Sequence, residues 1–425
     1  MVPLSGLEMA ADGATIRRGG WDRVLRQFPA LTSLEIRGGN WPWSSLPFIA
    51  ESAPLLQELR LVNLHMRIAR VQIDSLARLR QLRRLDLSGN RLDEMEINGL
   101  QGLRLDFLGL EGCNLQRWPL WLDSTAISRI GEVSLAGNHL TQLPAEAFSN
   151  AATRTQPIRL NLDGNRLLWS TVMDLRLSEQ RGQGFTYQMT VSAAMESQIN
   201  RGLEEHAGLS EVLERWVEDG MSTPADAAEP AGSRRLMVET MLGFWRDQLE
   251  IGHRPMLNLQ EPVLDNFVAD LPAFFLQRVR RMELVRPSGD AAALGRFLRR
   301  FNNLEELQVT GMAQPLDRLP PELAGLTGLQ DLSVTDAGLT IDQQAMDFLG
   351  GMPSLGYVQL DGNRLGDISN MRVWNDRGRS ISLARMALTQ WPEWLQPLLP
   401  TNIEFLNLDG NQLTDLPAFL LENRR

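Results

Sequence analysis

The chain has 425 residues and carries 42 basic against 52 acidic side chains, a net charge of −10. This acidic balance argues against a general electrostatic grip on nucleic acid or on an anionic membrane, and no apolar stretch reaches the roughly 20 residues that span a bilayer. A single cysteine excludes an internal disulfide and a cysteine-based metal cluster. A chain of this length exceeds one compact core, so we expect several domains or an array of repeats.

The first predicted element is an array of repeats over residues 1–168. One copy, 130–144, has the pattern L-x-x-L-x-L-x-x-N-x-L with a closing Leu-Pro, which is typical of a leucine-rich repeat, and the strongest copies are 82–92 and 160–167. One such unit cannot bury its own apolar face, so stacked copies are needed. The buried amide of Asn138 is expected to satisfy backbone groups of neighbouring coils. Copies of the pattern begin at Leu4, Leu31, Leu56, Leu82, Leu105, Ile130 and Pro157.

Helical periodicity replaces the repeats after Leu168. Apolar residues at steps of three or four predict one helix over 195–216 and a second over 234–249. The segment between them is rich in Pro, Ala, Gly, Asp and Ser, so a mobile loop is expected near 219–233. Residues 169–253 are therefore predicted to be a helical insert.

Repeats resume weakly at Arg254 and predict a second array over 254–425. Residues 31–150 map onto 304–423 at a constant offset of 273, and the similarity extends beyond the repeat pattern itself. The predicted fold is thus an α/β leucine-rich-repeat solenoid in two arrays separated by an α-helical insert, built by a long-period duplication.

The duplication also predicts that the chain is a fragment of a larger protein. In the first array another repeat follows Asn150, whereas the matching Asn423 is followed by two residues only. Repeat arrays need polar caps at both ends to cover their cores. We therefore expect further sequence at both ends.

A catalytic constellation is not predicted. Cys113 takes the ninth position of its repeat, where this class accepts Asn or Cys, and is expected to face inward. The four histidines are far apart in sequence and lack the spacing of metal ligands. No cofactor and no metal site is predicted, and enzymatic activity is left open.

Two tryptophan pairs interrupt the usual Leu-Pro. Trp118 and Trp391 stand at the leucine position and are expected to pack in the core. Trp121 and Trp394 follow three residues later and could lie on the convex side.

The variable positions of the repeat strands are expected to form a concave binding face. Arginine and aromatic residues are enriched at protein-interface hot spots, which guides the choice among these positions. The predicted protein-binding residues are Arg60, Arg83, Arg84, Phe107, Tyr357 and Phe405. The alternative interpretation is that mixed polar residues only keep the face soluble.

All 42 basic residues are arginine, because the sequence contains no lysine. GC-rich codon usage is one explanation. The other is selection against the lysine amines that accept ubiquitin, which would suit a protein working beside ubiquitin machinery in a host cell. The sequence leaves both explanations open.

Three motifs carry a resemblance: S-L-A-G-N-H-L-T-Q-L-P at 134–144, N-L-D-G-N-Q-L-T-D-L-P at 407–417 and L-G-F-W-R-D-Q-L at 242–249. In these the chain resembles the long leucine-rich-repeat proteins of Gram-negative bacteria whose repeats precede a cysteine-dependent NEL-type ubiquitin ligase domain. The resemblance implies repeats that recognise a host protein and restrain a ligase domain delivered by a secretion system. The ligase domain is absent from this sequence, and Cys113 does not match its catalytic cysteine.

The predicted function is a protein-recognition scaffold, the substrate-recognition region of such an effector. Its partner is expected to be a protein, with a host protein implied by the resemblance, and neither nucleic acid nor a membrane span is predicted. The implied location is the bacterial cytoplasm before export and then the host cell. Two alternatives stay open: the helical insert carries an enzymatic, membrane-binding or autoinhibitory activity, or the solenoid is purely structural or adhesive.

Overall fold

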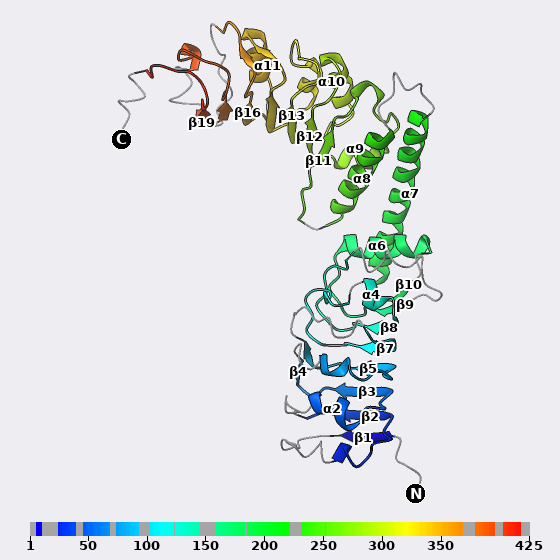
Figure 1. Ribbon diagram of the computed structural model, residues 1–425. Helices are drawn as coiled ribbons and strands as arrows, with labels where there is room; N and C mark the ends of the chain where they lie inside the picture. Colours follow the sequence, from blue (N-terminus) through cyan, green and yellow to red (C-terminus); the bar gives the residue numbers. More distant parts are fainter. Residues whose placement is uncertain are drawn as a thin grey trace. The chain divides into compact units, whose positions relative to one another are not determined.

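The computed structural model divides into two compact units, Met1–Leu203 and Glu204–Arg425, with the division inside one long helix (Figure 1). Each unit is built around a parallel sheet whose strands follow one another in chain order. The structure describes residues 6–10, 24–39, 46–68, 74–92, 102–122, 124–144, 158–182, 185–221, 231–250, 252–368, 379–395 and 403–417.

The first unit contains an eight-stranded parallel sheet. Its strands are β1 (Gly6–Ala10), β2 (Ser33–Arg37), β3 (Glu58–Val62), β5 (Arg84–Asp86), β7 (Leu105–Gly109), β8 (Ile130–Ser134), β9 (Ile158–Asn161) and β10 (Phe185–Gln188). The return segments of the coils contain α2 (Leu46–Ser52), α4 (Ser124–Ile127) and a small sheet of β4 (Arg67–Ile68) and β6 (Arg91–Leu92). The helices α6 (Trp169–Gln180) and α7 (Ala193–Met221) follow the repeats.

The second unit contains a seven-stranded parallel sheet. Its strands are β11 (Leu257–Gln260), β12 (Arg281–Val285), β13 (Glu306–Thr310), β14 (Asp331–Thr335), β16 (Tyr357–Gln359), β18 (Arg379–Ser382) and β19 (Ile403–Asn407). The other elements are α8 (Ala231–Asp247), η3 (Leu264–Asn266), α9 (Ala273–Arg278), α10 (Ala291–Leu298), η4 (Pro321–Gly325), α11 (Gln343–Gly350), η5 (Glu393–Leu395) and the pair β15 (Thr340–Ile341) and β17 (Arg364–Leu365).

Each coil buries alternate residues of its strand. In β3, for example, Leu59 and Leu61 are fully buried while Glu58 and Arg60 face away from the core. This follows from the two-residue period of a strand, since successive side chains point to opposite faces. The predicted α/β leucine-rich-repeat solenoid is confirmed by this architecture.

The predicted offset of 273 holds in the strand positions. β2, β3 and β5 move onto β13, β14 and β16, and β8 moves onto β19. Even the two small sheets correspond, because β4 and β6 move onto β15 and β17. The duplication is therefore one of complete coils and not only of apolar spacing.

Asparagine side chains join several of the coils to the coil before them. The Oδ1 atom of Asn90 accepts hydrogen bonds from the backbone N–H groups of Leu64 and Met66 at 3.2 and 3.1 Å, and its Nδ2 donates to the Leu61 and Leu87 carbonyls at 2.6 and 2.9 Å. Asn138, Asn165, Asn363 and Asn411 bond the backbone in the same way. These amides satisfy backbone groups that water cannot reach.

Cys113 takes the place of an asparagine in this series. Its side chain is fully buried, and the Sγ atom donates to the Leu87 carbonyl at 3.5 Å. The predicted inward position is confirmed.

The segment 169–253 is mostly helical but also contains a strand. β10 pairs in parallel with β9 and adds an eighth strand to the first sheet, although its F-T-Y-Q sequence lacks the repeat pattern. Of the predicted loop near 219–233, residues 219–221 and 231–233 are helical, and 222–230 lie outside the described residues.

The helices of this segment bury one apolar face each. Leu209 and Leu213 of α7 and Met241 and Phe244 of α8 are buried, and α8 packs against β11. Within the second unit, Glu205 of α7 accepts two hydrogen bonds from Arg278 of α9, at 2.6 and 2.9 Å. Helix–sheet packing and this ion pair fix the start of the second sheet.

The second tryptophan of each pair differs from the sequence expectation. Trp121 and Trp394 are buried and do not lie on an exposed convex surface, whereas Trp391 is half-buried. Trp118 is buried, as expected, and its Nε1 donates to the Leu122 carbonyl at 2.8 Å. The large apolar area of an indole ring favours burial of these tryptophans.

Candidate functional site

The candidate binding surfaces are the two open faces, defined as the strand side chains that point away from the core in each unit. Parallel register aligns these side chains in rows across the strands. On the first open face one row is Ser33, Glu58, Arg84, Phe107, Glu132 and Arg159. The adjacent row begins with Glu35, Arg60 and Asp86.

Charges of opposite sign alternate along the first open face. Arg60 lies 2.9 Å from Glu58 (Nε to Oε1) and 3.5 Å from Glu35 (Nη1 to Oε2). Arg84 Nε lies 3.5 Å from the same Glu58 carboxylate, which therefore bridges two guanidinium groups. Opposite charges on neighbouring strands attract, but partly exposed pairs of this kind contribute only about 0.2–1 kcal/mol each.

An arginine–aromatic pair occupies the centre of this face. The Arg84 guanidinium lies 4.8 Å from the centre of the Phe107 ring on the next strand, and the ring is only partly buried. Arg83, just before β5, is exposed. A guanidinium over a ring is attracted by the negative ring face, so the two side chains hold each other in place.

The six predicted binding residues fall into two groups. Arg60, Arg83, Arg84 and Phe107 gather on adjacent strands of the first unit. Tyr357 and Phe405 belong to the second unit, where Ser380 separates them in one row. They therefore belong to two faces, one in each of the two predicted arrays.

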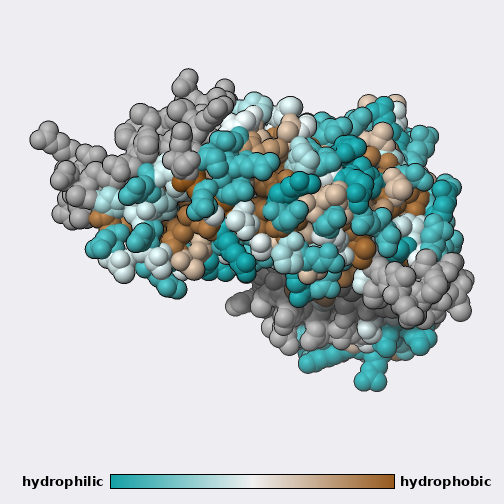
Figure 2. All heavy atoms as spheres, turned by 90° about the horizontal axis from the view of Figure 1, so that it is seen from above, coloured by the Kyte–Doolittle hydropathy of each residue, from teal (hydrophilic) through white to brown (hydrophobic). Residues whose placement is uncertain are grey.

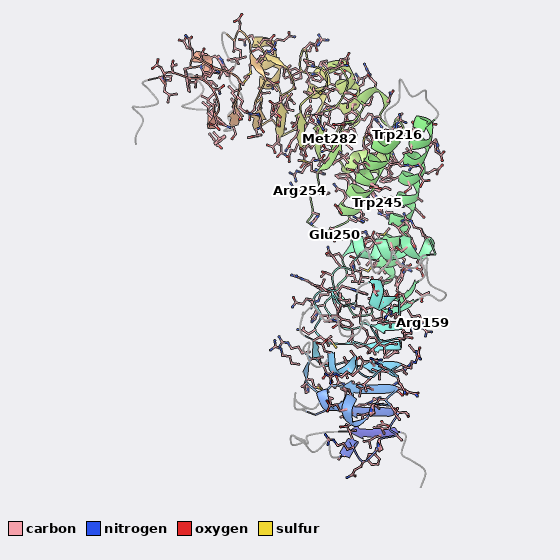
Figure 3. All side chains as sticks on the ribbon, in the orientation of Figure 1. Arg159, Trp216, Trp245, Glu250, Arg254 and Met282 are labelled. Atoms are coloured by element: carbon pink, nitrogen blue, oxygen red, sulfur yellow. The ribbon has the colours of Figure 1, made fainter. Side chains whose placement is uncertain are left out.

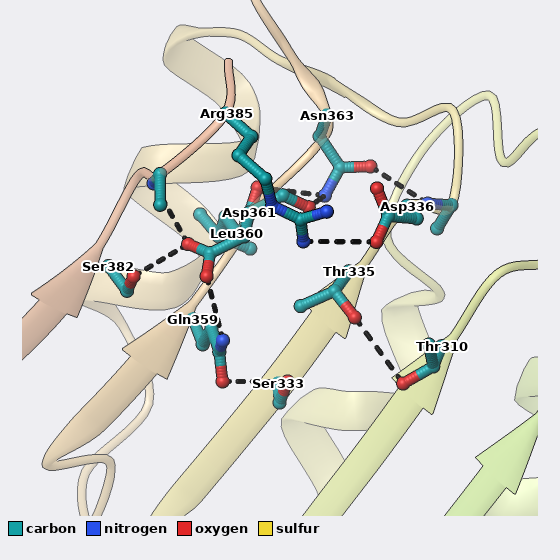
Figure 4. Close-up of polar contacts among 12 residues, drawn as sticks. Thr310, Ser333, Thr335, Asp336, Gln359, Leu360, Asp361, Asn363, Ser382 and Arg385 are labelled. Atoms are coloured by element: carbon teal, nitrogen blue, oxygen red, sulfur yellow. Dashed lines mark hydrogen bonds and ion pairs between the residues drawn. The ribbon is translucent and has the colours of Figure 1, made fainter. Parts of the chain in front are cut away.

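The second open face is organised by a buried carboxylate. Asp361, two residues after the end of β16, is 5% exposed and accepts hydrogen bonds from Ser382 Oγ at 2.6 Å and from the backbone N–H of Ala384 at 2.9 Å (Figure 4). Gln359 Nε2 donates to its other oxygen at 2.7 Å. A buried carboxylate is stable only when its lone pairs are satisfied in this way.

The network extends across the neighbouring strands. Asn407 donates to Ser382 Oγ at 3.0 Å, and Gln359 Oε1 accepts from Ser333 at 3.3 Å and from the Tyr357 hydroxyl at 3.4 Å. From β14 to β19 the second open face is thus a connected set of amides and hydroxyls around one carboxylate, whereas Arg281 and Glu306 form an ion pair across β12 and β13. Asp361 is not among the residues predicted from the sequence, where its one signal is an acid directly before the Gly-Asn of the repeat.

Electrostatics differ between outward residues of the second face. Burial raises the pKa of Asp331, and Glu306 on the next strand raises it further, while Arg281 opposes the shift. Burial also raises the pKa of the Tyr357 hydroxyl. Both groups are therefore held in their neutral forms more strongly than in water.

The described residues offer no catalytic chemistry at Cys113. Burial raises the pKa of its thiol to about 12, so the nucleophilic thiolate is scarce at neutral pH. His139 is exposed, and His206 is half-buried with its ring 5.3 Å from that of Trp245. Within the described ranges, no three His, Cys, Asp or Glu side chains gather as metal ligands would.

On the coloured part of the side seen in Figure 2, hydrophilic residues predominate, with hydrophobic patches between them. Arg159, labelled in Figure 3, lies on the first sheet and pairs with Glu132 at 3.0 Å. Among the helices of the described part, none combines the length and apolarity that crossing a membrane requires.

Comparisons with known proteins agree with the repeat geometry. The Leucine Rich Repeat family model matches residues 81–103, which include β5 and Asn90. No curated protein sequence matches the chain.

Solved structures similar to the chain include three repeat proteins. An internalin from Listeria monocytogenes has 14% identity over 98% of this chain and 84% of its own, with a TM-score of 0.32. The leucine-rich-repeat ectodomain of a plant receptor kinase from Arabidopsis thaliana has 17% identity over 91% and 40%, with a TM-score of 0.26. A leucine-rich-repeat protein from Leptospira interrogans has 14% identity over 85% of both chains, with a TM-score of 0.27.

TM-scores this low carry no argument about the fold, so the fold is identified from the geometry of the chain itself. One short parallel strand per coil, an asparagine that bonds successive coils, and the matched repeat at 81–103 agree. Together they identify an α/β leucine-rich-repeat solenoid, an architecture whose extended sheet face serves as a scaffold for binding other proteins.

Proposed function

We propose that the chain is a protein-recognition scaffold and that its first open face binds a partner protein. The observation that carries this proposal is the cluster of Arg60, Arg84 and Phe107 on adjacent strands. These side chains are partly exposed, and their backbone is fixed by the sheet. Arginine and aromatic side chains on a rigid support lose little conformational entropy when they bind.

The arginines of this face can form ion pairs with carboxylates of a partner. Glu58 is shared between Arg60 and Arg84, at 2.9 and 3.5 Å, and Arg60 also pairs with Glu35 at 3.5 Å. A carboxylate on a partner can take up the remaining donors of either fork. The proposed partner surface therefore carries acidic groups around an apolar contact for Phe107.

The test is capture of a partner from host-cell extract with matched variants. The triple variant Arg83→Ala, Arg84→Ala and Phe107→Ala removes the cluster. Its control, Tyr357→Ala with Ser380→Ala, changes the places equivalent to Arg84 and Phe107 in the second array. We expect the triple variant to lose at least tenfold in affinity for the captured protein, as for hot-spot residues, while the control retains it. Unchanged capture of every partner by the triple variant would contradict the proposal.

We further propose that the chain is the substrate-recognition region of a bacterial effector of the NEL-type ubiquitin ligase kind, exported from the bacterial cytoplasm into a host cell. The repeat motifs at 134–144 and 407–417 and the complete lack of lysine support this proposal. A chain without lysine side chains offers no such amine for ubiquitin transfer.

The effector proposal is tested by restoring lysine at exposed places away from the first open face. Arg235→Lys and Arg318→Lys keep the charge and add two acceptor amines. In host-cell extract with active ubiquitination, we expect the double variant to be modified and to turn over faster than the parent chain. Equal modification and turnover of both chains would favour codon usage as the reason for the missing lysine.

A further inference from the structure

One carboxylate on the second open face has no counter-charge. Asp331 is the first residue of β14, and its side chain is half-buried. Glu306, its register partner on β13, pairs with Arg281 at 2.5 Å and accepts from Gln308 at 2.8 Å. Within the described part of the chain, the Asp331 carboxylate forms no ion pair and accepts no hydrogen bond. A partly desolvated carboxylate in this state is stabilised when a donor reaches it.

The outward side chains of β11 to β14 carry more negative than positive charge. Their charged members are Arg281, Glu283, Glu306 and Asp331. One positive charge against three negative charges leaves an excess of two negative charges. Arg280 and Glu305, just before β12 and β13, pair with each other and cancel. Burial and the charge of Glu306 outweigh Arg281, so the pKa of Asp331 is raised, and a cation beside it would oppose both causes.

The rest of this sheet supplies no cation to Asp331. Arg254 belongs to the segment that leads into β11, three strands away from β14 (Figure 3). Arg385, which follows β18, pairs with Asp336 at 3.2 Å. Among the described strand side chains from β13 to β19 none is cationic, and the side chain of Arg379 in β18 lies outside this set. A positive charge for Asp331 is therefore expected from a binding partner.

Two aromatic side chains continue the row of Asp331. In register, the row runs through Asp331, Tyr357, Ser380 and Phe405. The Tyr357 hydroxyl donates to Gln359 Oε1 at 3.4 Å, which restrains the position of its ring (Figure 4). Phe405 is 55% exposed. Aromatic ring faces attract cations, and they also pack against the aliphatic stem of an arginine side chain.

We propose that this row of the second open face binds an arginine side chain of a partner protein. The guanidinium pairs with the Asp331 carboxylate, and its flat face lies on the Tyr357 ring. An apolar group at this place would bury the carboxylate without a partner, and an acidic group would add a like charge. A neutral donor would leave the negative charge unbalanced. The site belongs to the second unit and does not depend on the proposed binding at the first open face.

The proposal is tested by ligand-observed NMR titration of the whole chain with three capped peptides that differ only in a central arginine, citrulline or glutamate. Citrulline has the planar end and the length of arginine but no charge. We expect saturable binding of the arginine peptide at millimolar concentration, about tenfold weaker binding of the citrulline peptide, and weaker binding still of the glutamate peptide. Asp331→Asn keeps the size of the side chain and should remove the preference for arginine over citrulline. Tyr357→Leu should weaken the arginine peptide by about threefold, because the stacking on the ring is lost.

The matched control is Asp317→Asn, which removes the same charge from an exposed place between β13 and β14. It should bind the arginine peptide as the parent chain does. Far-ultraviolet circular dichroism checks that the variants are folded. Equal binding of the arginine and citrulline peptides by the parent chain would overturn the proposal in favour of a neutral hydrogen-bonding ligand, such as the hydroxyl groups of a sugar. The proposal is also overturned if the arginine peptide does not saturate, or if Asp331→Asn and Asp317→Asn have equal effects.

Discussion

At the offset of 273 residues the two arrays can be compared position by position. The inward pairs are all aliphatic: Leu34 and Leu307, Ile36 and Val309, Leu59 and Leu332, Leu61 and Val334, Leu85 and Val358, Leu108 and Ile381. Each of these side chains is at most 2% exposed. Close packing tolerates only residues of similar shape and volume, so the interiors of the two arrays remained alike.

The outward pairs differ in chemistry at nearly every place. Arg60 corresponds to Ser333 at this offset, and Arg84 corresponds to Tyr357. Glu58 and Asp331 are the one outward acidic pair among the strands from β2 to β8 and their equivalents. Because an outward side chain packs against few neighbours, it can change without loss of the fold. The two open faces therefore present different side-chain chemistry.

The arrays also differ in how deeply two equivalent asparagines, Asn138 and Asn411, are buried. Asn138 is 1% exposed beneath β9, while its equivalent Asn411 is half-buried next to β19, the last strand of the second sheet. Both side chains donate to two backbone carbonyls, at 2.8 Å in every case. Asn411 Oδ1 accepts from the backbone N–H groups of Met386 and Leu388, and Asn138 Oδ1 accepts from that of Leu115, so the pair compares a buried asparagine with a half-buried one in similar bonding.

The largest expected effect is that of Asn138→Ala. It leaves several buried backbone groups without partners, at about 1–3 kcal/mol each, so we expect a loss of about 4 kcal/mol in the free energy of unfolding. Asn411→Ala should cost about half as much, because water can replace the lost partners. Urea unfolding measures both values, with the exposed Asn200→Ala as the control. Equal losses in the free energy of unfolding for Asn138→Ala and Asn411→Ala would show that burial does not determine how much these asparagines stabilise the coils.

The next effect distinguishes the polar networks of the two arrays. Asp361→Ala removes the acceptor of Ser382, Ala384 and Gln359, and we expect it to cost about 2–3 kcal/mol. Ser88→Ala changes the equivalent place in the first array and should cost less than about 1 kcal/mol, since Ser88 Oγ accepts one backbone hydrogen bond near the surface. Thermal unfolding measures the stability of both variants. A similar loss of stability for Asp361→Ala and Ser88→Ala would show that Asp361 does not organise the second open face.

The third effect is a pH dependence of stability that comes from Cys113, whose equivalent in the second array, Met386, does not titrate. The pKa of Cys113 rises from 9.0 to about 12 through burial, so the native state holds this proton more tightly than the unfolded state. Its contribution to stability is complete below pH 9 and is lost as the pH rises toward 12. By pH 10 the loss should be roughly 1 kcal/mol.

The control for this pH effect is Cys113→Ala, which lacks the titrating thiol. Its stability should fall less between pH 8 and pH 10 than that of the parent chain, when urea unfolding is measured at both values. Rapid reaction of the native thiol with iodoacetamide at pH 8, as fast as in the urea-unfolded chain, would contradict the protected position of Cys113.

The smallest expected effect is an exchange between the open faces. Arg84→Tyr places the residue found at 357 on the first face and should change the free energy of unfolding by less than about 1 kcal/mol. The lost contacts are a partly exposed ion pair with Glu58 and the stacking on Phe107. The same exchange should abolish partner capture by the first face. A large loss of stability would mean that the face serves the fold and not recognition.

The sequence by itself determined the coil positions, the inward residues, the asparagine ladder and the duplication. These features depend on short-range spacing, since each strand of about five residues and its following asparagine repeat locally. Asn138 and Cys113 could be placed inward because their positions within one repeat decide their direction. Local spacing also separated the two arrays from the intervening helices.

Only the tertiary structure decided which outward side chains meet. Arg84 reaches Phe107 and Asp361 reaches Ser382 across 23 and 21 residues of chain, and Arg281 reaches the backbone carbonyl of Arg254 across 27. Such contacts depend on the register of neighbouring strands and on the length of each return segment, which the repeat pattern does not specify. β10 shows the same limit, because F-T-Y-Q joins the sheet by pairing with β9 and not by any repeat signature of its own.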